Sequence, residues 1–228
     1  MRIIRSDERG LSQYDWLDSR HTFSFADYYN PDNKGVSVLR VINDDTVAAG
    51  AGFDTHSHRD VEIISYVLEG AIAHKDSMGN ITRLEAGEFQ VMTAGTGITH
   101  SEYNPSPTDQ LRFLQIWIWP NAKGLMPTYT QKFFPNTTRR QLIASPSGRD
   151  GSLVINQDAT LERLRLTAGD KELLSVGPDR TGMLHIVSGT LETDTADLGA
   201  GDALIAQDGK QLQLNTTTNT EALWFDLP

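Results

Sequence analysis

Short hydrophobic runs rich in β-branched and aromatic residues alternate with turn-forming residues along the whole chain. The runs that predict strands are residues 36–42, 61–68, 89–92, 111–119, 161–166, 184–187, 203–205 and 222–225. Turn signals lie between them at residues 43–45, 69–70, 78–80, 104–107, 188–189 and 208–209. No long segment has the apolar period of a helix. Many short strands at this spacing predict a β-sandwich or a β-barrel.

The two halves of the chain resemble each other. Residues 66–72 (Tyr-Val-Leu-Glu-Gly-Ala-Ile) align with residues 185–191 (His-Ile-Val-Ser-Gly-Thr-Leu). Farther on, an acidic glycine turn at residues 84–89 aligns with a similar turn at residues 198–203. A strand, a glycine turn, a second strand and an acidic glycine turn thus occur twice, which predicts a duplicated barrel. The alternative is that such turns are common in any β protein.

A polar stretch rich in turn formers, residues 145–152, indicates the boundary between the halves. We therefore expect an N-terminal barrel over residues 1–144 and a C-terminal barrel over residues 145–228. The length of 228 residues suits two small β domains.

Composition adds constraints on location and partners. The formal net charge of −10 opposes general binding to nucleic acid phosphates, so no direct nucleic acid contact is expected. No apolar run has the length that a membrane span needs, and residues 1–9 lack the apolar stretch of a signal peptide. We expect a soluble protein that acts in the cytoplasm without a membrane partner.

The absence of cysteine narrows the chemistry further. It excludes disulfides, thiolate metal sites, cysteine nucleophiles and iron–sulfur clusters. Any bound metal must therefore be held by imidazole and carboxylate groups.

Two histidines, His56 and His58, stand two residues apart at the start of a predicted strand. On an extended strand, residues i and i+2 point to the same face, so both rings can reach one ion. A bare His-x-His pattern also occurs without a metal, and by itself it does not decide between the two interpretations.

A second segment, residues 93–102, brings His100 and Glu102 two residues apart after a glycine-rich turn. Adjacent strands of a barrel can place both pairs inside. Three neutral imidazoles and one carboxylate would leave two positions of an octahedral divalent ion open, as sites that activate oxygen or chelate a substrate require. A closed, tetrahedral structural zinc site is the alternative.

These segments resemble the cupin superfamily. The first cupin motif is satisfied by Gly50, His56, His58 and Glu62. The second motif is satisfied by Gly87, Gly97, His100 and Asn104. Gly70 comes one residue later than the pattern specifies, and Thr93 stands where a proline is usual.

Within the superfamily, the chain resembles the pirin family over nearly its whole length. The matching segments are residues 18–25, 28–29, 56–60, 93–98, 100–102, 115–117 and 149–153. The resemblance implies an all-β bicupin, with two cupin (double-stranded β-helix, jelly-roll) barrels packed together. It also implies one divalent metal in the N-terminal barrel, held by His56, His58, His100 and Glu102. Some bacterial members look like quercetin 2,3-dioxygenases, and this chain is similar to them in length and motif.

The C-terminal barrel is expected to lack a metal. The positions that correspond to the His-x-His pair fall at Ser175 and Gly177, and the position that corresponds to His100 falls at Leu214. None of these side chains can take the part of a histidine ligand, which predicts one metal per chain.

Other polar residues are interpreted as structural. His185 is expected to fill the interior of a barrel, His74 to lie on a solvated hairpin, and His21 to make an N-terminal hydrogen bond. Glu62 is expected to orient a histidine ring. The aromatic residues expected in the core and at interfaces, with one or two at a pocket mouth, are Phe23, Phe25, Tyr28, Tyr29, Trp117 and Trp119.

The resemblance implies a metal-dependent dioxygenase that opens the ring of a flavonol such as quercetin, with dioxygen as the second substrate. Glu102 would be the general base that takes the proton of the flavonol 3-hydroxyl group. Iron is the first expectation for the metal, followed by nickel or manganese, and cobalt, copper and zinc also suit these ligands.

Two other classes of function stay open. One is a metal-binding regulatory protein that acts through protein partners, as pirin itself is linked to transcriptional co-regulation. The other is a different cupin activity, such as isomerase or decarboxylase chemistry, which needs no oxygen. The dioxygenase is favoured over the regulator because no segment resembles a docking peptide.

Overall fold

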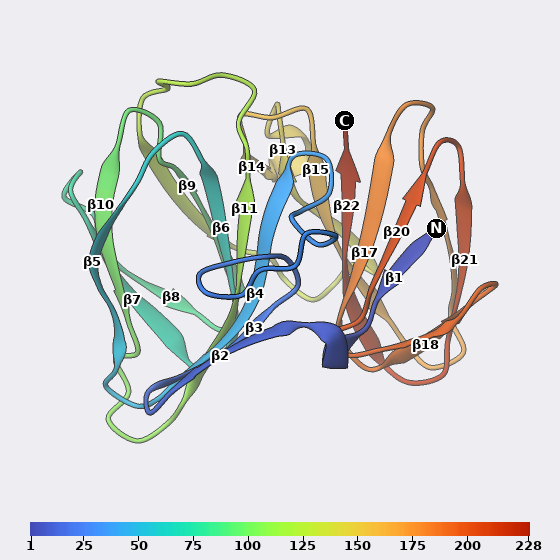
Figure 1. Cartoon of the computed structure of the whole chain (residues 1–228), viewed down its shortest axis with the longest axis horizontal. Coiled ribbons are helices and arrows are strands. Elements are labelled where there is room, and N and C mark those ends of the chain that lie inside the picture. Colours follow the sequence, from blue (N-terminus) through green and yellow to red (C-terminus); the bar gives the residue numbers. More distant parts are fainter. The chain divides into compact units, whose positions relative to one another are not determined.

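The computed structural model describes residues 1–228, and nearly every regular element is a β-strand (Figure 1). The exceptions are two single-turn 3-10 helices, η1 (Ser6–Glu8) and η2 (Arg149–Gly151). The predicted all-β fold is confirmed. No helix of the chain has the length and apolar character that crossing a membrane requires.

The chain forms two compact units. We call the unit of residues Gly10–Phe134 and Leu153–Gln157 the first barrel. The unit of Met1–Arg9, Pro135–Ser152 and Asp158–Pro228 is called the second barrel.

This division differs from the predicted domains, 1–144 and 145–228, at three places along the chain. Residues 1–9 belong to the second barrel because their strand pairs with a strand near residue 204. Residues 135–144 also belong there because they lead into a strand that pairs at Leu161–Leu164. Residues 153–157 belong to the first barrel.

The first barrel consists of two antiparallel sheets. Its strands are β2 (Gly10–Tyr14), β3 (Leu17–His21), β4 (Leu39–Val47), β5 (Gly52–His58), β6 (Glu62–Glu69), β7 (Ala71–Asp76), β8 (Ile81–Glu85), β9 (Glu88–Thr93), β10 (Ile98–Tyr103), β11 (Leu111–Ile118) and β12 (Thr128–Phe133), with β14 (Leu153–Val154) in the same unit. One sheet has the order β12-β9-β6-β11-β4-β3-β2, and the other has the order β5-β10-β7-β8. Figure 1 shows the two sheets facing each other around a common interior.

The second barrel also has two sheets. Its strands are β1 (Arg2–Ile4), β13 (Arg140–Ser145), β15 (Thr160–Leu166), β16 (Lys171–Ser175), β17 (Thr181–Ser188), β18 (Thr190–Thr193), β19 (Asp197–Gly199), β20 (Ala203–Gln207), β21 (Gln211–Thr216) and β22 (Thr220–Leu227). One sheet contains β1-β20-β17-β22-β15-β13 in this order, and the other contains β16-β21-β18-β19.

The strand orders confirm the predicted repeat. The series β9-β6-β11-β4 and β5-β10-β7-β8 of the first barrel recur as β20-β17-β22-β15 and β16-β21-β18-β19 in the second. The aligned turn glycines also match, since Gly70 has a φ of 76° and Gly189 has a φ of 80°. Positive φ values of this size favour glycine because it has no Cβ atom, so the same turn geometry selects the same residue twice.

The interiors of the two barrels differ. In the second barrel, the inner positions of β16 and β21 hold Leu174, Leu212 and Leu214, which belong to one continuous apolar core. The first barrel contains two separate apolar clusters, one around Phe113 and one around Ile63. Buried polar residues of the seven-stranded sheet occupy other interior positions of this barrel.

Residues 43–45, predicted as a turn, lie in the middle of β4 instead. The prediction was wrong because the propensity of Asn-Asp-Asp for turns is outweighed by pairing on both sides of the strand. Asn43 pairs with His21 on β3 and with Gln115 on β11. Asp44 forms a two-pronged ion pair with Arg112, with both distances at 2.9 Å.

Phe89 tests how strongly buried aromatic packing on the seven-stranded sheet stabilises the first barrel. Its ring is fully buried and stacks on Tyr66, with the ring centroids 3.9 Å apart. We expect Phe89→Ala to lower the free energy of unfolding by about 3–5 kcal/mol, because it leaves a cavity that its neighbours cannot fill. Urea denaturation measures the change.

Phe133→Ala is the matched control, since Phe133 is 53% exposed on the neighbouring strand β12. It is expected to change stability by about 1 kcal/mol or less. Equal losses in the two variants would contradict the packing argument.

Candidate metal centre

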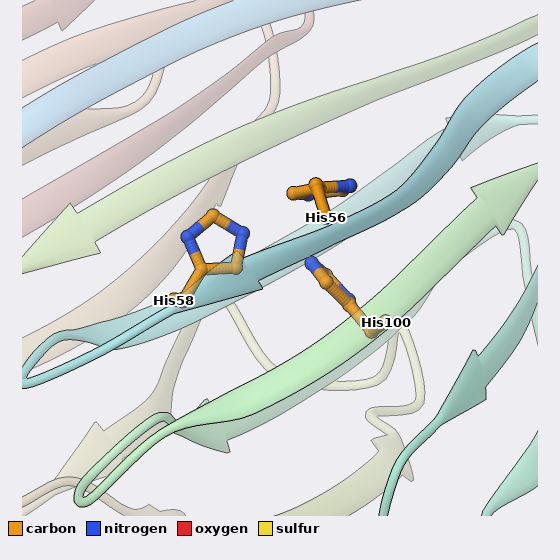
Figure 2. Close-up of side chains that lie close together, drawn as sticks. All are labelled: His56, His58 and His100. Atoms are coloured by element: carbon orange, nitrogen blue, oxygen red, sulfur yellow. The ribbon is translucent and has the colours of Figure 1, made fainter.

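Three histidine side chains converge inside the first barrel. His100 on β10 pairs directly with His56 on β5, and Ile98 pairs with His58. The ring centroids lie 4.5 Å apart for His56 and His100, 4.8 Å for His56 and His58, and 4.9 Å for His58 and His100. Figure 2 shows the three rings turned toward one another from these two strands.

A β-bulge adjusts which side chains face this cluster. His100 pairs with His56, but Glu102 pairs with Phe53, so β5 has one residue more than β10 over this interval. A bulge of this kind changes the alternation of side chains along the longer strand. Phe53 and His56 therefore line the same pocket, although three positions separate them.

The histidine nitrogens are suited to hold a metal ion. Nε2 of His58 and both ring nitrogens of His100 are buried and have no hydrogen-bond partner within the protein. Nδ1 of His56 lies 2.7 Å from the carbonyl oxygen of Asp54, to which a protonated Nδ1 donates. In that tautomer Nε2 of His56 is unprotonated and presents its lone pair.

Electrostatics keeps two of these rings neutral. Burial, together with the neighbouring histidines, lowers the pKa of His58 to about 4. The same causes, burial first, lower the pKa of His100 to about 3. Neutral imidazole is the form that binds a metal, so neither His58 nor His100 has to lose a proton at neutral pH before an ion enters.

Glu102 belongs to a second group of potential ligands, with His74 and His100, whose ligand atoms lie within 4.8 Å of one another. His56, His58 and His100 form the first such group. His100 belongs to both groups, so Glu102 lies next to the cluster of three histidines on the side of His100. Its carboxylate is only 2% exposed.

Three side-chain donors hold the Glu102 carboxylate. Nε2 of Gln115 donates to Oε2 over 3.0 Å, and Nε2 of Gln90 donates to Oε1 over 3.3 Å. The hydroxyl of Ser65 lies 3.5 Å from the same Oε1 atom. Donors on both oxygens fix the orientation of the carboxylate inside the barrel.

These donors belong to what we call the polar row, the buried residues His21, Asn43, Gln115, Ser65 and Gln90. They are neighbours in register across five adjacent strands, β3, β4, β11, β6 and β9. Sequence reasoning missed the row because its members lie far apart along the chain. The available signal was the polar residue at the centre of each apolar run, such as Ser65 and Gln115.

A pocket of about 310 Å³ opens beside the cluster. It is lined by His56, His58 and Glu102 and by the aromatic rings of Trp16, Phe25, Phe53 and Trp117. The expectation that one or two aromatic residues line the pocket is confirmed for Phe25 and Trp117. The ring of Trp117 meets His58 edge to face at 5.0 Å, and its Nε1 donates to Gln115 over 3.1 Å.

A polar wall completes the pocket. It consists of Ser12, Ser19, His21, Asn43 and Asp45 from β2, β3 and β4. Burial raises the pKa of Asp45 to about 7, although a hydrogen bond from Ser19 partly opposes that shift. His21, for which the sequence indicated only a structural hydrogen bond, is therefore a residue of the pocket.

Three of the structural interpretations made from the sequence are wrong. His74 is 1% exposed rather than solvated, since its ring stacks on Tyr129 with centroids 4.6 Å apart. Glu62 does not orient a histidine ring, because its carboxylate accepts hydrogen bonds from Thr93 and Asn156. His185 is buried, but it stands between Leu184 and Ile186 of the apolar core on β17, so its side chain faces the other side of the sheet and does not fill the interior of the barrel.

Comparison with known proteins identifies the family. Residues 4–118 match the Pirin family profile, and residues 142–227 match the profile described as the quercetinase C-terminal cupin domain. The chain belongs to the pirin family. The prediction of two cupin barrels, made from the motifs of this family, is thereby confirmed.

Curated relatives of this pirin-family chain match over almost its full length. A protein of Escherichia coli strain K12 named quercetin 2,3-dioxygenase is 46% identical over 226 residues, which cover 99% of this chain and 98% of that protein. A pirin-like protein of Caulobacter vibrioides is 38% identical, with 96% of each chain covered.

Solved pirin structures share the fold closely. The crystal structure of YhhW from Escherichia coli has a TM-score of 0.97 at 45% identity and covers 100% of this chain and 97% of its own. The structure of bacterial pirin YhhW from Escherichia coli in complex with nickel(II) has a TM-score of 0.96 at 44% identity, with 100% and 98% covered.

Glu62 makes the stability of this pirin-family protein depend on pH. Burial raises the pKa of Glu62, and hydrogen bonds from Thr93 and Asn156 oppose that shift only in part. The folded protein therefore keeps a proton that the unfolded chain has already lost, and the free energy of unfolding falls as the pH rises through this interval.

We expect Glu62→Gln to remove this slope while keeping an oxygen acceptor for Thr93. The free energy of unfolding of the variant minus that of the wild type should be larger at about pH 8 than at about pH 5. Urea denaturation at the two pH values measures this difference. Glu85→Gln, which changes an exposed carboxylate paired with Arg83, is the control. If the free energy of unfolding has the same pH dependence in the wild type and in Glu62→Gln, Glu62 is not the group that causes it.

Proposed function

We propose that this protein is a metal-dependent dioxygenase that opens the ring of a flavonol of the quercetin type. One observation carries the proposal: three histidine rings, of which His100 is buried and His56 and His58 are half-buried, converge beside an aromatic pocket. Full-length relatives named quercetin 2,3-dioxygenase support the choice of reaction. The pocket volume of about 310 Å³ lies at the lower end of the range for small-molecule sites.

The proposed ligands of one divalent metal are His56, His58, His100 and Glu102. The unpartnered nitrogens of His58 and His100 support this assignment, because buried polar atoms without a hydrogen bond are rare in proteins. Imidazole and carboxylate donors suit several divalent ions. We propose iron as the metal in the cell, and the nickel(II) complex of YhhW supports nickel as an ion that such a site also accepts.

A bound divalent ion would supply Lewis acidity to the hydroxyl and carbonyl oxygens of the substrate. The residues of the chain supply the remaining functions. Glu102 takes the proton of the flavonol 3-hydroxyl group as general base, and Gln115 and Gln90 hold its carboxylate in place. Trp117, Phe25 and Phe53 bind the planar rings and exclude water from them.

The other classes of function receive less support. A regulatory protein that acts through partners is not favoured, because relatives that are 46% and 43% identical over 99% and 100% of this chain are named as enzymes. Isomerase or decarboxylase chemistry differs from the proposed dioxygenase reaction because it needs no oxygen, so activity without oxygen would distinguish it. A protein partner and a cytoplasmic location stay predictions from the sequence.

Metal content tests the ligand assignment. We expect the wild type to bind one divalent ion per chain and His58→Ala or His100→Ala to lose most of it, because each variant removes a ring from the cluster. Elemental analysis of untagged protein measures the ratio. His185→Leu is the control, since His185 lies in the second barrel and its loss should leave the ratio unchanged. Full metal content in His56→Ala/His100→Ala would disprove the assignment.

Oxygen consumption with quercetin tests the reaction. Because general-base catalysis typically contributes about 10²–10⁴-fold, we expect Glu102→Gln to lower kcat at least about a hundredfold. Metal content is measured in parallel, so that loss of the ion is distinguished from loss of the base. Full turnover by a metal-loaded Glu102→Gln variant would exclude this role, and wild-type turnover under argon would indicate one of the oxygen-independent reactions.

A further inference from the structure

We infer that the polar wall of the pocket, centred on Asp45, binds a substrate hydroxyl group other than the one that reacts. The protein would thereby select polyhydroxylated flavonols over 3-hydroxyflavone, which carries the reacting hydroxyl alone. This inference rests on the proposed function for the class of substrate. It assigns a specificity-determining role to residues outside the histidine cluster and Glu102.

The strand register builds the wall. Ser12 on β2 pairs with Ser19 on β3, and Ser19 pairs with Asp45 on β4. Two residues farther along β3 and β4, His21 pairs with Asn43. All five side chains line the pocket. They come from one edge of the seven-stranded sheet, whereas the clustered histidines come from the opposite, four-stranded sheet.

Hydrogen bonds within the wall leave one oxygen available. The Ser19 hydroxyl donates a hydrogen bond to Oδ1 of Asp45. Ser19 occupies Oδ1, which leaves the other carboxyl oxygen, Oδ2, for a ligand in the pocket that Asp45 lines, and Asp45 as a whole is only 3% exposed. A buried carboxyl group is costly unless its oxygens are satisfied. A ligand hydroxyl at Oδ2 supplies such a bond.

His21 holds the rest of the wall in place. Its Nδ1 lies 2.8 Å from Oδ1 of Asn43, and its Nε2 lies 2.9 Å from the hydroxyl of Ser12. Because the amide oxygen only accepts, Nδ1 carries a proton toward Asn43, and Nε2 forms the second hydrogen bond with the Ser12 hydroxyl. This arrangement fixes Ser12 and Asn43 before a ligand arrives, so recognition requires little reorganisation.

The rest of the pocket identifies the ligand as a hydroxylated aromatic molecule. Trp16, Phe25, Phe53 and Trp117 provide apolar ring surfaces suited to planar rings. A phenolic hydroxyl both donates and accepts, so it bonds Asp45 whether the carboxyl group is ionised or protonated. An apolar ring without a hydroxyl would offer Oδ2 of Asp45 no hydrogen bond and would bind more weakly.

Equilibrium binding to the metal-loaded protein tests the inference. Quenching of tryptophan fluorescence gives the Kd of quercetin and of 3-hydroxyflavone for the wild type and for Asp45→Ala. We expect the wild type to prefer quercetin and Asp45→Ala to lower that preference about tenfold or more, the usual effect of losing a hydrogen bond to a charged group. The Kd of 3-hydroxyflavone should change much less.

Controls separate this result from general damage to the fold. Asp179→Ala removes an exposed carboxylate of the second barrel and should leave both Kd values unchanged. Asp45→Asn keeps the shape and an acceptor for Ser19, so it should fold even if Asp45→Ala does not. It is expected to show a smaller loss of preference in the same direction.

The outcomes distinguish this inference from the proposed reaction. Equal weakening of both flavonols in the Asp45 variants, or no binding of either flavonol to the wild type, would overturn the inference. If the Asp45-dependent preference is observed but no oxygen is consumed with either flavonol, the subsite stands and the dioxygenase assignment fails.

Discussion

The buried carboxylate of Glu102 is stable inside the first barrel because donors on neighbouring strands of the sheet hold it. A buried carboxylate such as Glu102 would be strongly unfavourable in an apolar interior. The polar row provides its donors, since Gln115, Ser65 and Gln90 stand next to one another on three adjacent strands. The rest of the centre depends on this arrangement. It fixes the carboxylate beside His100, and it links the carboxylate through Gln115 to Trp117.

The second barrel shows what the same topology does without these polar groups. Its strands follow the same order, and its turn glycines have nearly the same φ values. Leucines occupy the inner positions of β16 and β21, which correspond to the strands of the histidines. The chemistry therefore comes from the side chains placed on the scaffold, and the topology alone does not determine it.

The sequence predicted the all-β fold, the repeat and the residues of the histidine cluster. The fold and the repeat are confirmed, and the three histidines lie together, because alternating runs, glycine turns and His-x-His spacing are local signals that the strand geometry preserves. The part of these histidines as metal ligands stays a proposal. The sequence did not predict the polar wall. Asn43 and Asp45 form part of a segment that is typical of a turn, and only pairing with β3 and β11 makes it a strand. The roles of His74 and Glu62 depend on contacts with Tyr129 and Asn156, which are distant in the sequence.

The path of the chain between the two units limits how the protein can be divided. Residues 1–9 complete the second barrel, and residues 153–157 return to the first after the second has begun. No single cut of the polypeptide thus releases either barrel intact. A fragment that ends at residue 144 would leave Arg2–Ile4 without β20 and Glu62 without Asn156. Dissection of this protein into halves therefore requires rearranging the gene so that each discontinuous unit becomes one continuous polypeptide.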